Sequence, residues 1–281
     1  MVGKEKYELV ENNQNIKKED KEKIFRLFDV ANRIEFGKIG PRQEGYLLEG
    51  QGWPRCTSVM SMDGNKAGAL MEWAKREIAQ KMHDMLIEML HSGKKISDTD
   101  AAWLVEQALK EPERQKDEAA DSGTKAHDNI ENWLNGKEHY KDDRLTRFKD
   151  IWVKEGMEIV CTELPVVYCK DGLGFGGRLD ILAYDNGDFY IDDNKTSKSV
   201  HQGYALQLSA YKAAVEQMSK GEIQIKGAKI IHLPDVSVLK KWQLDAYNKL
   251  GPLVECKDLD KAFEHYKVLL QQYYLRNNKY Y

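Results

Sequence analysis

The sequence predicts an α/β (α+β) fold, in which a helical N-terminal region precedes a sheet in the second half of the chain. Three observations support this prediction. Apolar residues recur at helical spacing through most of residues 18–156. A further helical pattern covers residues 202–218. Runs rich in Val, Ile, Thr and Tyr indicate strands, at residues 158–169, 179–184, 189–196 and 223–233.

Several helix boundaries follow from capping residues. Ser97 and Asp98 are suited to begin a helix that runs to about Lys110. Pro112 suits the first turn of a separate helix that ends near Gly136. The other helices before and after the sheet are expected at residues 18–32, 67–90, 142–156 and 259–275. Residues 37–54 are rich in turn residues, and the glycines of 172–177 are interpreted as a turn between strands.

Composition indicates a globular protein. The chain has 281 residues, of which 41% are hydrophobic and 32% charged, so it can bury a sizeable core. The net charge of −3 is not that of a typical nucleic-acid-binding protein, although a binding groove needs only a local group of Lys and Arg. No apolar run approaches the roughly 18–20 residues that span a bilayer, so we expect no membrane partner.

The N-terminal residues and the cysteines indicate in which cellular compartment the protein is expected. Residues 1–17 are polar and mixed in charge, so we expect neither a signal peptide nor a transit peptide. The four cysteines are far apart and form no CxxC pair: Cys56, Cys161, Cys169 and Cys256. This spacing argues against a zinc ribbon or an iron–sulfur cluster, and it favours free thiols in a reducing cytoplasm.

A hairpin in the sheet region is the most informative stretch. Asn186-Gly187 lies between two β-rich runs, and this dipeptide favours a two-residue type I′ turn because both central residues need positive φ. In such a hairpin the numbers of paired residues have a constant sum, so Asp185 pairs with Asp188. The same register places Asp180 directly opposite Asp193.

Two opposed aspartates need a compensating charge. Their Cβ atoms would be about 4.5–5.5 Å apart, where like charges are destabilising. A shared divalent cation would offset the repulsion, because Mg²⁺ favours carboxylate oxygens. Lys195 projects to the same face as Asp193, whereas Asp192 points to the other face. An ordinary exposed hairpin tip with scattered charges is the alternative. We favour the metal site because the rest of this face is apolar, with Leu182, Tyr184, Phe189 and Ile191.

These residues resemble the core motif of the PD-(D/E)XK nucleases, in particular the RecB-type branch with its phage-type and mitochondrial genome maintenance exonucleases. The motif is an Asp after a short glycine-led strand, followed by D/E-x-K on the partner strand. Here Gly177-x-x-Asp180 and Asp193-Asn194-Lys195 are similar to it, and Thr196-Ser197-Lys198 extends the pattern. D-x-K alone is a weak motif, so further motifs are needed to support the resemblance.

Two helical motifs strengthen the resemblance. Gln207 and Tyr211 match the QxxxY motif of the branch, and a spacing of four residues places them on one helix face. The pentapeptide Gly123–His127 is similar to the GTxxH helix that supplies a histidine metal ligand. By itself each has a simpler interpretation, Tyr211 as a core residue of an amphipathic helix and His127 as a satisfied core histidine.

The resemblance extends over roughly residues 53–233. Residues 53–59 loosely match an N-terminal segment of the phage-type and mitochondrial relatives, and Glu163 occupies the usual acidic position on the strand before Asp180. A solvated strand charge is an equally good interpretation of Glu163. The family implies a restriction-endonuclease-like central mixed sheet flanked by helices. We expect a helical region at 1–110, packed on a nuclease core at 111–281, as one continuous unit.

The resemblance also implies a site. Asp180, Asp193 and Lys195 would be catalytic. His127, Asp180, Asp193 and the backbone carbonyl of Asn194 would bind Mg²⁺ or Mn²⁺, with Glu163 as a weaker candidate. The remaining residues of these motifs, Thr196, Lys198, Gln207 and Tyr211, would bind the DNA, although Gln207 and Tyr211 could instead brace the lysine. The four-cysteine staple of some relatives is missing, so we expect no iron–sulfur cluster.

The expected function is a metal-dependent DNA nuclease, most simply an exonuclease on single strands or DNA ends in replication, recombination or repair. Recombination or replication proteins are possible partners, and the expected location is the cytoplasm of a bacterial or phage-infected cell. Alternatives are a sequence-tolerant endonuclease and a non-cleaving nucleic-acid-binding module. A nucleotide phosphohydrolase is disfavoured because no triphosphate-binding motif is present.

Overall fold

The computed structural model describes residues 2–93 and 96–277, with the backbone alone at 65–67. The chain divides into two compact units. Residues 1–62 and 126–281 form the first, called the core unit here, and residues 63–125 form the second, the hairpin unit. No helix in the described part of the chain is both long and apolar enough to cross a membrane.

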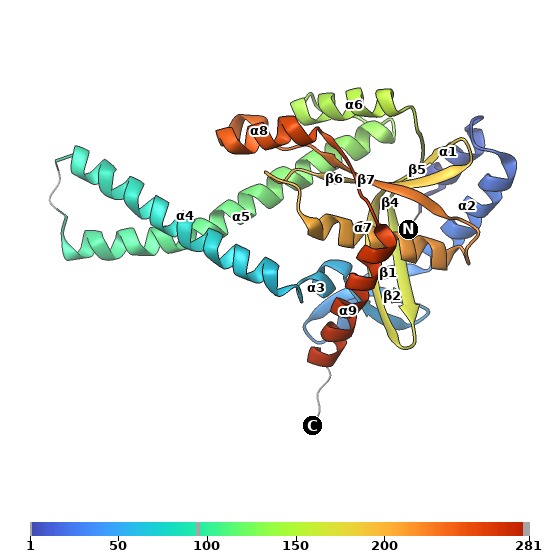
Figure 1. Cartoon of the computed structure of the whole chain (residues 1–281), viewed down its shortest axis with the longest axis horizontal. Helices are drawn as coiled ribbons and strands as arrows, with labels where there is room; N and C mark the ends of the chain where they lie inside the picture. Colours follow the sequence, from blue (N-terminus) through green and yellow to red (C-terminus); the bar gives the residue numbers. More distant parts are fainter. Residues whose placement is uncertain (1, 94–95, 278–281) are drawn as a thin grey trace. The chain divides into compact units, whose positions relative to one another are not determined.

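A five-stranded mixed sheet is the centre of the core unit (Figure 1). Its strands lie in sequence order, so each pairs with the next along the chain. Only β6 and β7 are parallel, and the other neighbours are antiparallel. The strands are β4 (Glu158–Lys170), β5 (Leu173–Asp185), β6 (Asp188–Lys195), β7 (Ile225–His232) and β8 (Leu253–Glu255). The mixed sheet and its flanking helices confirm the predicted fold class.

The turn between β5 and β6 is the predicted one. Asn186 and Gly187 both have positive φ, of 50° and 108°. Asp185 pairs with Asp188, and the register continues to Ile181 opposite Asp192. The next position along this register brings Asp180 opposite Asp193. The hairpin prediction is therefore confirmed as far as the Ile181–Asp192 pair, where the strand pairing ends.

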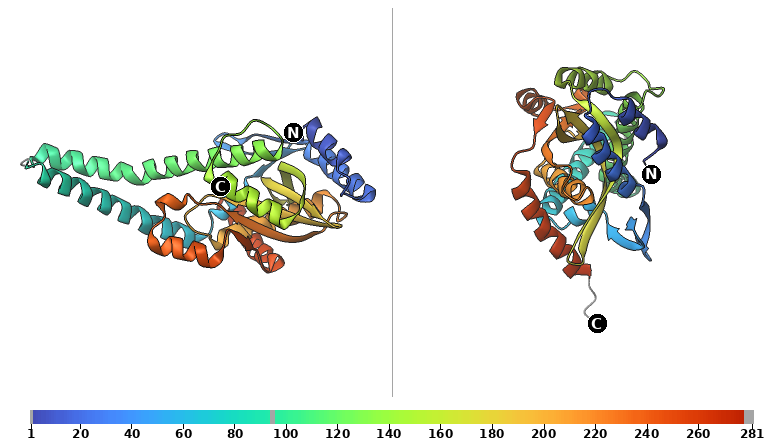
Figure 2. Two further views of the ribbon diagram at one scale, coloured as in Figure 1. Left: turned by 90° about the horizontal axis from the view of Figure 1, so that it is seen from above. Right: turned by 90° about the vertical axis from the view of Figure 1, so that its right-hand side faces the viewer.

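The two faces of the sheet pack against different helices, because side chains alternate along each strand. One face, with Leu182 and Tyr184, joins a core shared with five helices. They are α1 (Lys4–Asn12), α2 (Lys18–Ala31), α3 (Cys56–Met60), α7 (Gln202–Met218) and α9 (Leu259–Asn277). The other face, with Ile181 and Ala183, packs on α6 (Asp143–Glu155) and on the part of α5 (Asp98–Leu134) that belongs to the core unit. Figure 2 shows helices on both sides of the sheet.

A second sheet corrects the prediction for residues 37–54. This stretch forms β1 (Ile34–Gly40), β2 (Gln43–Leu48) and β3 (Gln51–Pro54), joined as an antiparallel meander. Its turn residues lie between short strands, and Tyr46 and Trp53 pack into the main core. The pattern of a short, half-exposed strand is too weak to recognise among so many turn residues.

The glycine-rich stretch 172–177 also differs from the prediction. Only Asp171 and Gly172 turn, with positive φ, and residues 173–177 are part of β5. A Cβ atom at Gly174 would overlap the ring of Trp53, and one at Gly176 would overlap Tyr46. These glycines therefore provide space for the aromatic rings of the second sheet. Short elements that the sequence did not indicate are α1, α3, β8 and α8 (Lys241–Leu250).

In the hairpin unit, α4 (Gly64–His91) and the first part of α5 are the expected helices, with one correction. Ser97 caps α5 as predicted, since its Oγ accepts from the backbone N–H of Asp100 at 3.2 Å. However, α5 continues through Pro112 instead of restarting there, and residue 110, where a boundary was expected, lies inside it. Proline costs a helix about 3 kcal/mol. Packing offsets this cost, because Pro112 is buried and Gln115 donates to Glu77 of α4 at 3.0 Å.

The β5–β6 turn gives a stability prediction. We expect Gly187→Ala to lower the free energy of unfolding by about 1–2 kcal/mol, because an L-residue is strained at positive φ. As a control, Gly203→Ala in α7 has ordinary φ and only a 3.4 Å contact with Met60, so helix propensity should raise stability by up to about 1 kcal/mol. Urea unfolding measures both, and equal effects of the two substitutions would contradict the turn assignment.

Candidate active site

Three carboxyl groups lie in one row across β4, β5 and β6. Thr162 pairs with Ile181 and Leu164 with Leu179, so Glu163 lies opposite Asp180 on one side. The β5–β6 register places Asp193 opposite Asp180 on the other side. The candidate site is thus built from the middle of three neighbouring strands. The sequence predicted only one half of this row, the Asp180–Asp193 pair.

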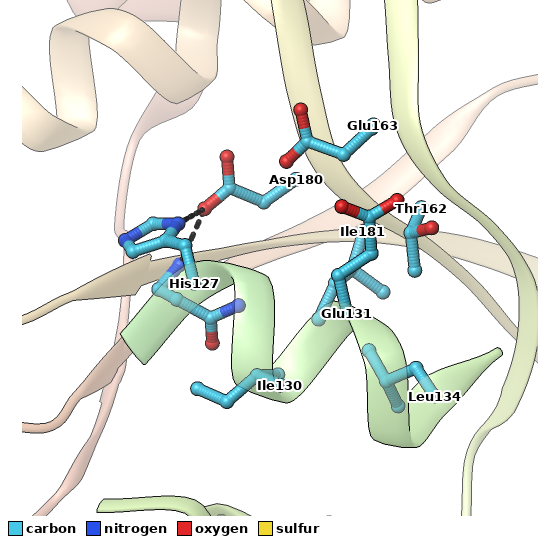
Figure 3. Close-up of a pocket in the computed structure, with 9 residues that line it drawn as sticks. His127, Ile130, Glu131, Leu134, Thr162, Glu163, Asp180 and Ile181 are labelled. Carbon is cyan, nitrogen blue, oxygen red and sulfur yellow. Dashed lines mark hydrogen bonds and ion pairs between the residues drawn. The ribbon is translucent and has the colours of Figure 1, made fainter. Parts of the chain in front are cut away.

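Asp180 is the centre of the row. Its Oδ2 accepts a hydrogen bond from the backbone N–H of Asn194 at 2.9 Å, and it lies 3.4 Å from Nδ1 of His127. His127 approaches from α5, and Figure 3 shows its ring pointing at the Asp180 carboxylate. The Asp180 side chain is 15% exposed, so the carboxylate remains open to the pocket. The structure therefore brings together His127 and Asp180, two of the predicted metal ligands.

Asp193 and Lys195 form a buried ion pair one strand further. The Asp193 side chain is 1% exposed, and its Oδ2 pairs with the Lys195 ammonium. The other carboxylate oxygen of Asp193, Oδ1, is buried and has no partner among the described residues. Burial, and then the Asp180 charge, raise the pKa of Asp193. Burial lowers the pKa of Lys195, but Asp193 and Asp180 raise it further, so the net direction is upward.

Glu163 has an unusual backbone conformation. Its φ is 49°, in the left-handed region, although it lies within β4. Such strain costs about 1–3 kcal/mol and is often found at functional sites. Burial, followed by the Asp180 charge, raises the pKa of Glu163 to about 7. The structure thus places this weaker candidate in the same pocket as Asp180 and His127 (Figure 3).

The QxxxY residues lie behind the site. Tyr211 is 3% exposed, and its OH accepts a hydrogen bond from Nε2 of Gln207 at 3.0 Å. A Cβ atom at Gly177 would overlap the Tyr211 ring, which explains the glycine that leads the Gly177-x-x-Asp180 motif. Tyr211 therefore packs against β5 at Gly177 and does not face solvent.

The residues after Lys195 form a turn between β6 and α7. Thr196 is half-buried, and Lys198 is exposed at the surface of this turn. Both predicted DNA contacts thus follow Lys195 closely in the sequence.

Glu131 is a pocket residue that the sequence analysis missed. It lines the same pocket as His127, Asp180 and Glu163, and its charge raises the pKa of Glu163 (Figure 3). Its spacing of four residues from His127 places both on one face of α5, which was a usable signal. It was overlooked because a glutamate on a helix is usually solvated.

The donor atoms of this site fit a divalent cation. Within residues 2–93 and 96–277, no three His, Cys, Asp or Glu side chains are grouped so that they could hold an ion. The fit rests on the chemistry of the donors. Oδ1 of Asp193 is buried without a partner among the described residues, Asp180 lies beside Asp193, and His127 lies 3.4 Å from Asp180. Carboxylate and imidazole donors suit Mg²⁺ or Mn²⁺.

A family model of the PD-(D/E)XK nuclease superfamily matches residues 72–273. The chain belongs to this superfamily. The matched range covers most of the chain and contains every predicted site residue, from His127 to Tyr211. No curated protein matches the chain. Members of the PD-(D/E)XK superfamily are nucleases that typically use divalent metal ions, so the chain is identified as a nuclease of this type acting on DNA.

Membership of the PD-(D/E)XK superfamily leaves the branch open. The RecB-type assignment, and with it residues 53–59 as a shared N-terminal segment, stays a prediction. In the structure these residues form the end of β3 and most of α3. The predicted site residues lie instead on α5, β4, β5, β6, α7 and the turn after β6.

The row of carboxyl groups predicts how stability depends on pH. The pKa of Glu163 and of Asp193 is raised from values near 4 toward 7. Between these values the folded state holds protons that the unfolded state has released, so stability should fall as pH rises through this window. Asp180→Asn removes a charge that raises both pKa values and should make the fall smaller.

Urea unfolding between pH 4.5 and 7.5 in the presence of EDTA tests this dependence. Asp150→Asn, at an exposed position of α6, is the matched control and should leave the pH dependence as in the wild type. If Asp180→Asn and Asp150→Asn give the same slope of stability against pH, the coupling within the row is wrong.

Proposed function

We propose that this protein is a Mg²⁺- or Mn²⁺-dependent deoxyribonuclease that works as an exonuclease on single strands or DNA ends. One observation carries this proposal. Asp193 is buried between the acid Asp180 and the cation Lys195, with one carboxylate oxygen paired to Lys195 and the other, Oδ1, without a partner among the described residues. A carboxylate held in this way is poorly solvated and suited to a divalent cation, and Lys195 is already charged beside it.

The metal ligands of this proposal come from a helix and from the sheet. His127 approaches from α5, and Asp180, Asp193 and the backbone carbonyl of Asn194 come from the sheet. Glu163 is an additional ligand candidate because it shares the pocket. When bound, a divalent cation supplies Lewis acidity, which polarises the scissile phosphate and makes water more acidic.

Lys195 acts on the reacting phosphate in this proposal. Its raised pKa keeps the ammonium charged at neutral pH, and Asp193 fixes its position. The ammonium would donate hydrogen bonds to the attacking water and to a phosphate oxygen, which stabilises the charge of the transition state. The water oxygen forms the new P–O bond as the P–O bond to the leaving strand breaks, the water gives up a proton to solvent, and the leaving oxygen takes a proton from solvent.

The supporting residues divide into two groups in this proposal. Lys198 is exposed and can contact a DNA phosphate, and Thr196 can contact the strand beside it. Tyr211 is too buried to contact DNA directly, so it supports β5 through Gly177, with Gln207 bound to its hydroxyl. Action in recombination, replication or repair in the cytoplasm, with protein partners of those pathways, is part of the same proposal.

The choice between exonuclease and endonuclease depends on DNA ends. We expect end-labelled linear DNA, single-stranded above all, to be degraded with Mg²⁺ or Mn²⁺ but not with EDTA, while circular DNA survives. Cleavage of circular DNA would favour the sequence-tolerant endonuclease. Binding without cleavage under every metal condition would favour the non-cleaving module.

The catalytic assignment predicts the effect of two substitutions. Asp193→Asn and Lys195→Met should each lower the cleavage rate by about 100-fold or more, the usual loss when a group that stabilises transition-state charge is removed. Lys226→Met is a matched control, because Lys226 is an exposed lysine of β7 with no ion pair among the described residues, and it should cut as the wild type does. Rates on labelled DNA, with circular dichroism to confirm folding, decide the matter. Substantial cleavage by folded Lys195→Met would refute the assignment.

His127 gives a separate prediction about metal affinity. His127→Ala should weaken Mn²⁺ binding by roughly 10- to 100-fold and affect DNA binding in EDTA much less, because the imidazole faces Asp180. Calorimetric titration with Mn²⁺ measures the first quantity and fluorescence anisotropy the second. His139→Ala, at an exposed position, is the control. If the Mn²⁺ affinity is unchanged, His127 is a packing residue and not a metal ligand.

A further inference from the structure

The turn between β6 and α7 has no regular secondary structure. The side chains of His232 and Tyr204 both bind one of its residues, Ser197. Ser197 is the second residue of this turn, between Thr196 and Lys198. Its carbonyl oxygen lies 2.7 Å from Nε2 of His232. Its Oγ accepts a hydrogen bond from the hydroxyl of Tyr204 at 2.9 Å and donates to the carbonyl of Ser199 at 2.8 Å. Ser197 is therefore held at its main chain and at its side chain.

The state of His232 follows from this geometry. A carbonyl oxygen can only accept, so Nε2 carries the proton and donates. His232 is 2% exposed, and its Nδ1 is buried without a hydrogen bond among the described residues. Burial lowers the pKa of His232, in agreement with a neutral ring. A hydrocarbon side chain would fill this place without an unpaired nitrogen, so the bond to Ser197 is the contribution that is specific to histidine.

The His232 ring is itself fixed from behind. Tyr247 of α8 packs edge-on against it, with ring centroids 5.4 Å apart. The hydroxyl of Tyr247 accepts a hydrogen bond from Arg147 of α6 at 2.9 Å, and Arg147 also donates to the carbonyl of Pro234 at 2.6 Å. These contacts give the missed helix α8 a place in the site, because they prevent the imidazole from turning away from Ser197.

Both residues that hold Ser197 also contact Lys195. His232 is the register partner of Lys195 in the parallel β6–β7 pair, and the next N–H, of Leu233, donates to the Lys195 carbonyl at 2.7 Å. The Lys195 ammonium lies over the Tyr204 ring, 5.1 Å from its centroid, at the distance of a cation–π interaction. Tyr204 thus contacts both the Lys195 ammonium and Ser197, while β7 holds the Lys195 main chain by strand pairing and Ser197 through the His232 side chain.

We infer that His232 and Tyr204 are positioning residues of the nuclease, which hold Ser197 from two sides and so fix Lys195 and the Thr196–Ser199 turn for the DNA strand. This inference rests on the proposed function. In a flexible turn, Thr196 and Lys198 would lose their arrangement, and a misplacement of about 1 Å in a reactive group can cost 100-fold in rate. Neither residue is expected to touch the reacting atoms.

The first test separates the hydrogen bond from the space that His232 fills. His232→Phe keeps the ring and its packing on Tyr247 but removes the N–H, and should lower kcat/KM on single-stranded DNA by roughly 10- to 100-fold. His232→Gln places an amide N–H where Nε2 stood and should restore the rate to within about threefold of the wild type. His265→Phe, at an exposed position of α9, is the control for the substitution and should have no effect.

The second test does not depend on cleavage. Amide hydrogen exchange at residues 196–200 should be at least tenfold faster in His232→Phe than in the wild type, His232→Gln or His265→Phe. Tyr204→Phe keeps the ring over Lys195 and removes only the hydroxyl, so it should also speed exchange, with a smaller loss of rate. It replaces His232→Phe as the decisive variant if that protein does not fold.

These outcomes separate the two proposals. If the wild type does not cut DNA with any metal, the proposed function fails, while hydrogen exchange still tests the hold on Ser197. If the wild type cuts and His232→Phe matches it in both rate and exchange, the inference is overturned. Slow cleavage that His232→Gln does not restore would also overturn it, because the defect would then come from packing rather than from the N–H.

Discussion

The repulsion between neighbouring carboxyl groups is the constraint on which this structure depends. Strand pairing places Glu163, Asp180 and Asp193 side by side, at distances where like charges destabilise a sheet. Burial is the larger cause of the raised pKa values of Glu163 and Asp193, and the Asp180 charge adds to it. The local structure supplies partial compensation: the Asn194 N–H for Asp180, and the Lys195 ammonium for Asp193. The repulsion that remains is what the proposed cation would offset.

Much of this site could be predicted from the sequence, because a hairpin obeys simple rules. Asn186-Gly187 specifies the turn, and the turn specifies the register that opposes Asp180 and Asp193. Alternation along β6 then separates Lys195 from Asp192, which lies on the other face beside Lys229. The strands of the sheet and the long helices were predicted for the same reason, since their patterns are local and repeated over many residues, whereas the mixed sheet was implied by the family resemblance.

The parts that could not be predicted depend on contacts between distant segments. Gly174 and Gly176 of β5 are required because the rings of Trp53 and Tyr46 pack against them, and these rings are more than a hundred residues away in the sequence. Helix α5 passes through Pro112 because packing within the hairpin unit outweighs a local rule. Likewise the positive φ of Glu163 and the hydrogen bond from His232 to Ser197 leave no periodic signal in the sequence.

The same electrostatics link the binding of cation and DNA. Three carboxyl groups repel the phosphates that a nuclease must bind, and the net charge of −3 offers no general attraction. In the proposed function, phosphate would therefore be attracted at close range by the cations at the site, among them Lys195 and Lys198. A divalent cation among the carboxylates would reverse the sign of the local potential, so DNA would bind more tightly in its presence. Linkage requires the reverse with the same factor: bound DNA would raise the affinity for the cation. A rigid turn after Lys195 strengthens this coupling, because a phosphate held by Thr196 and Lys198 is kept at a fixed distance from the row of acids.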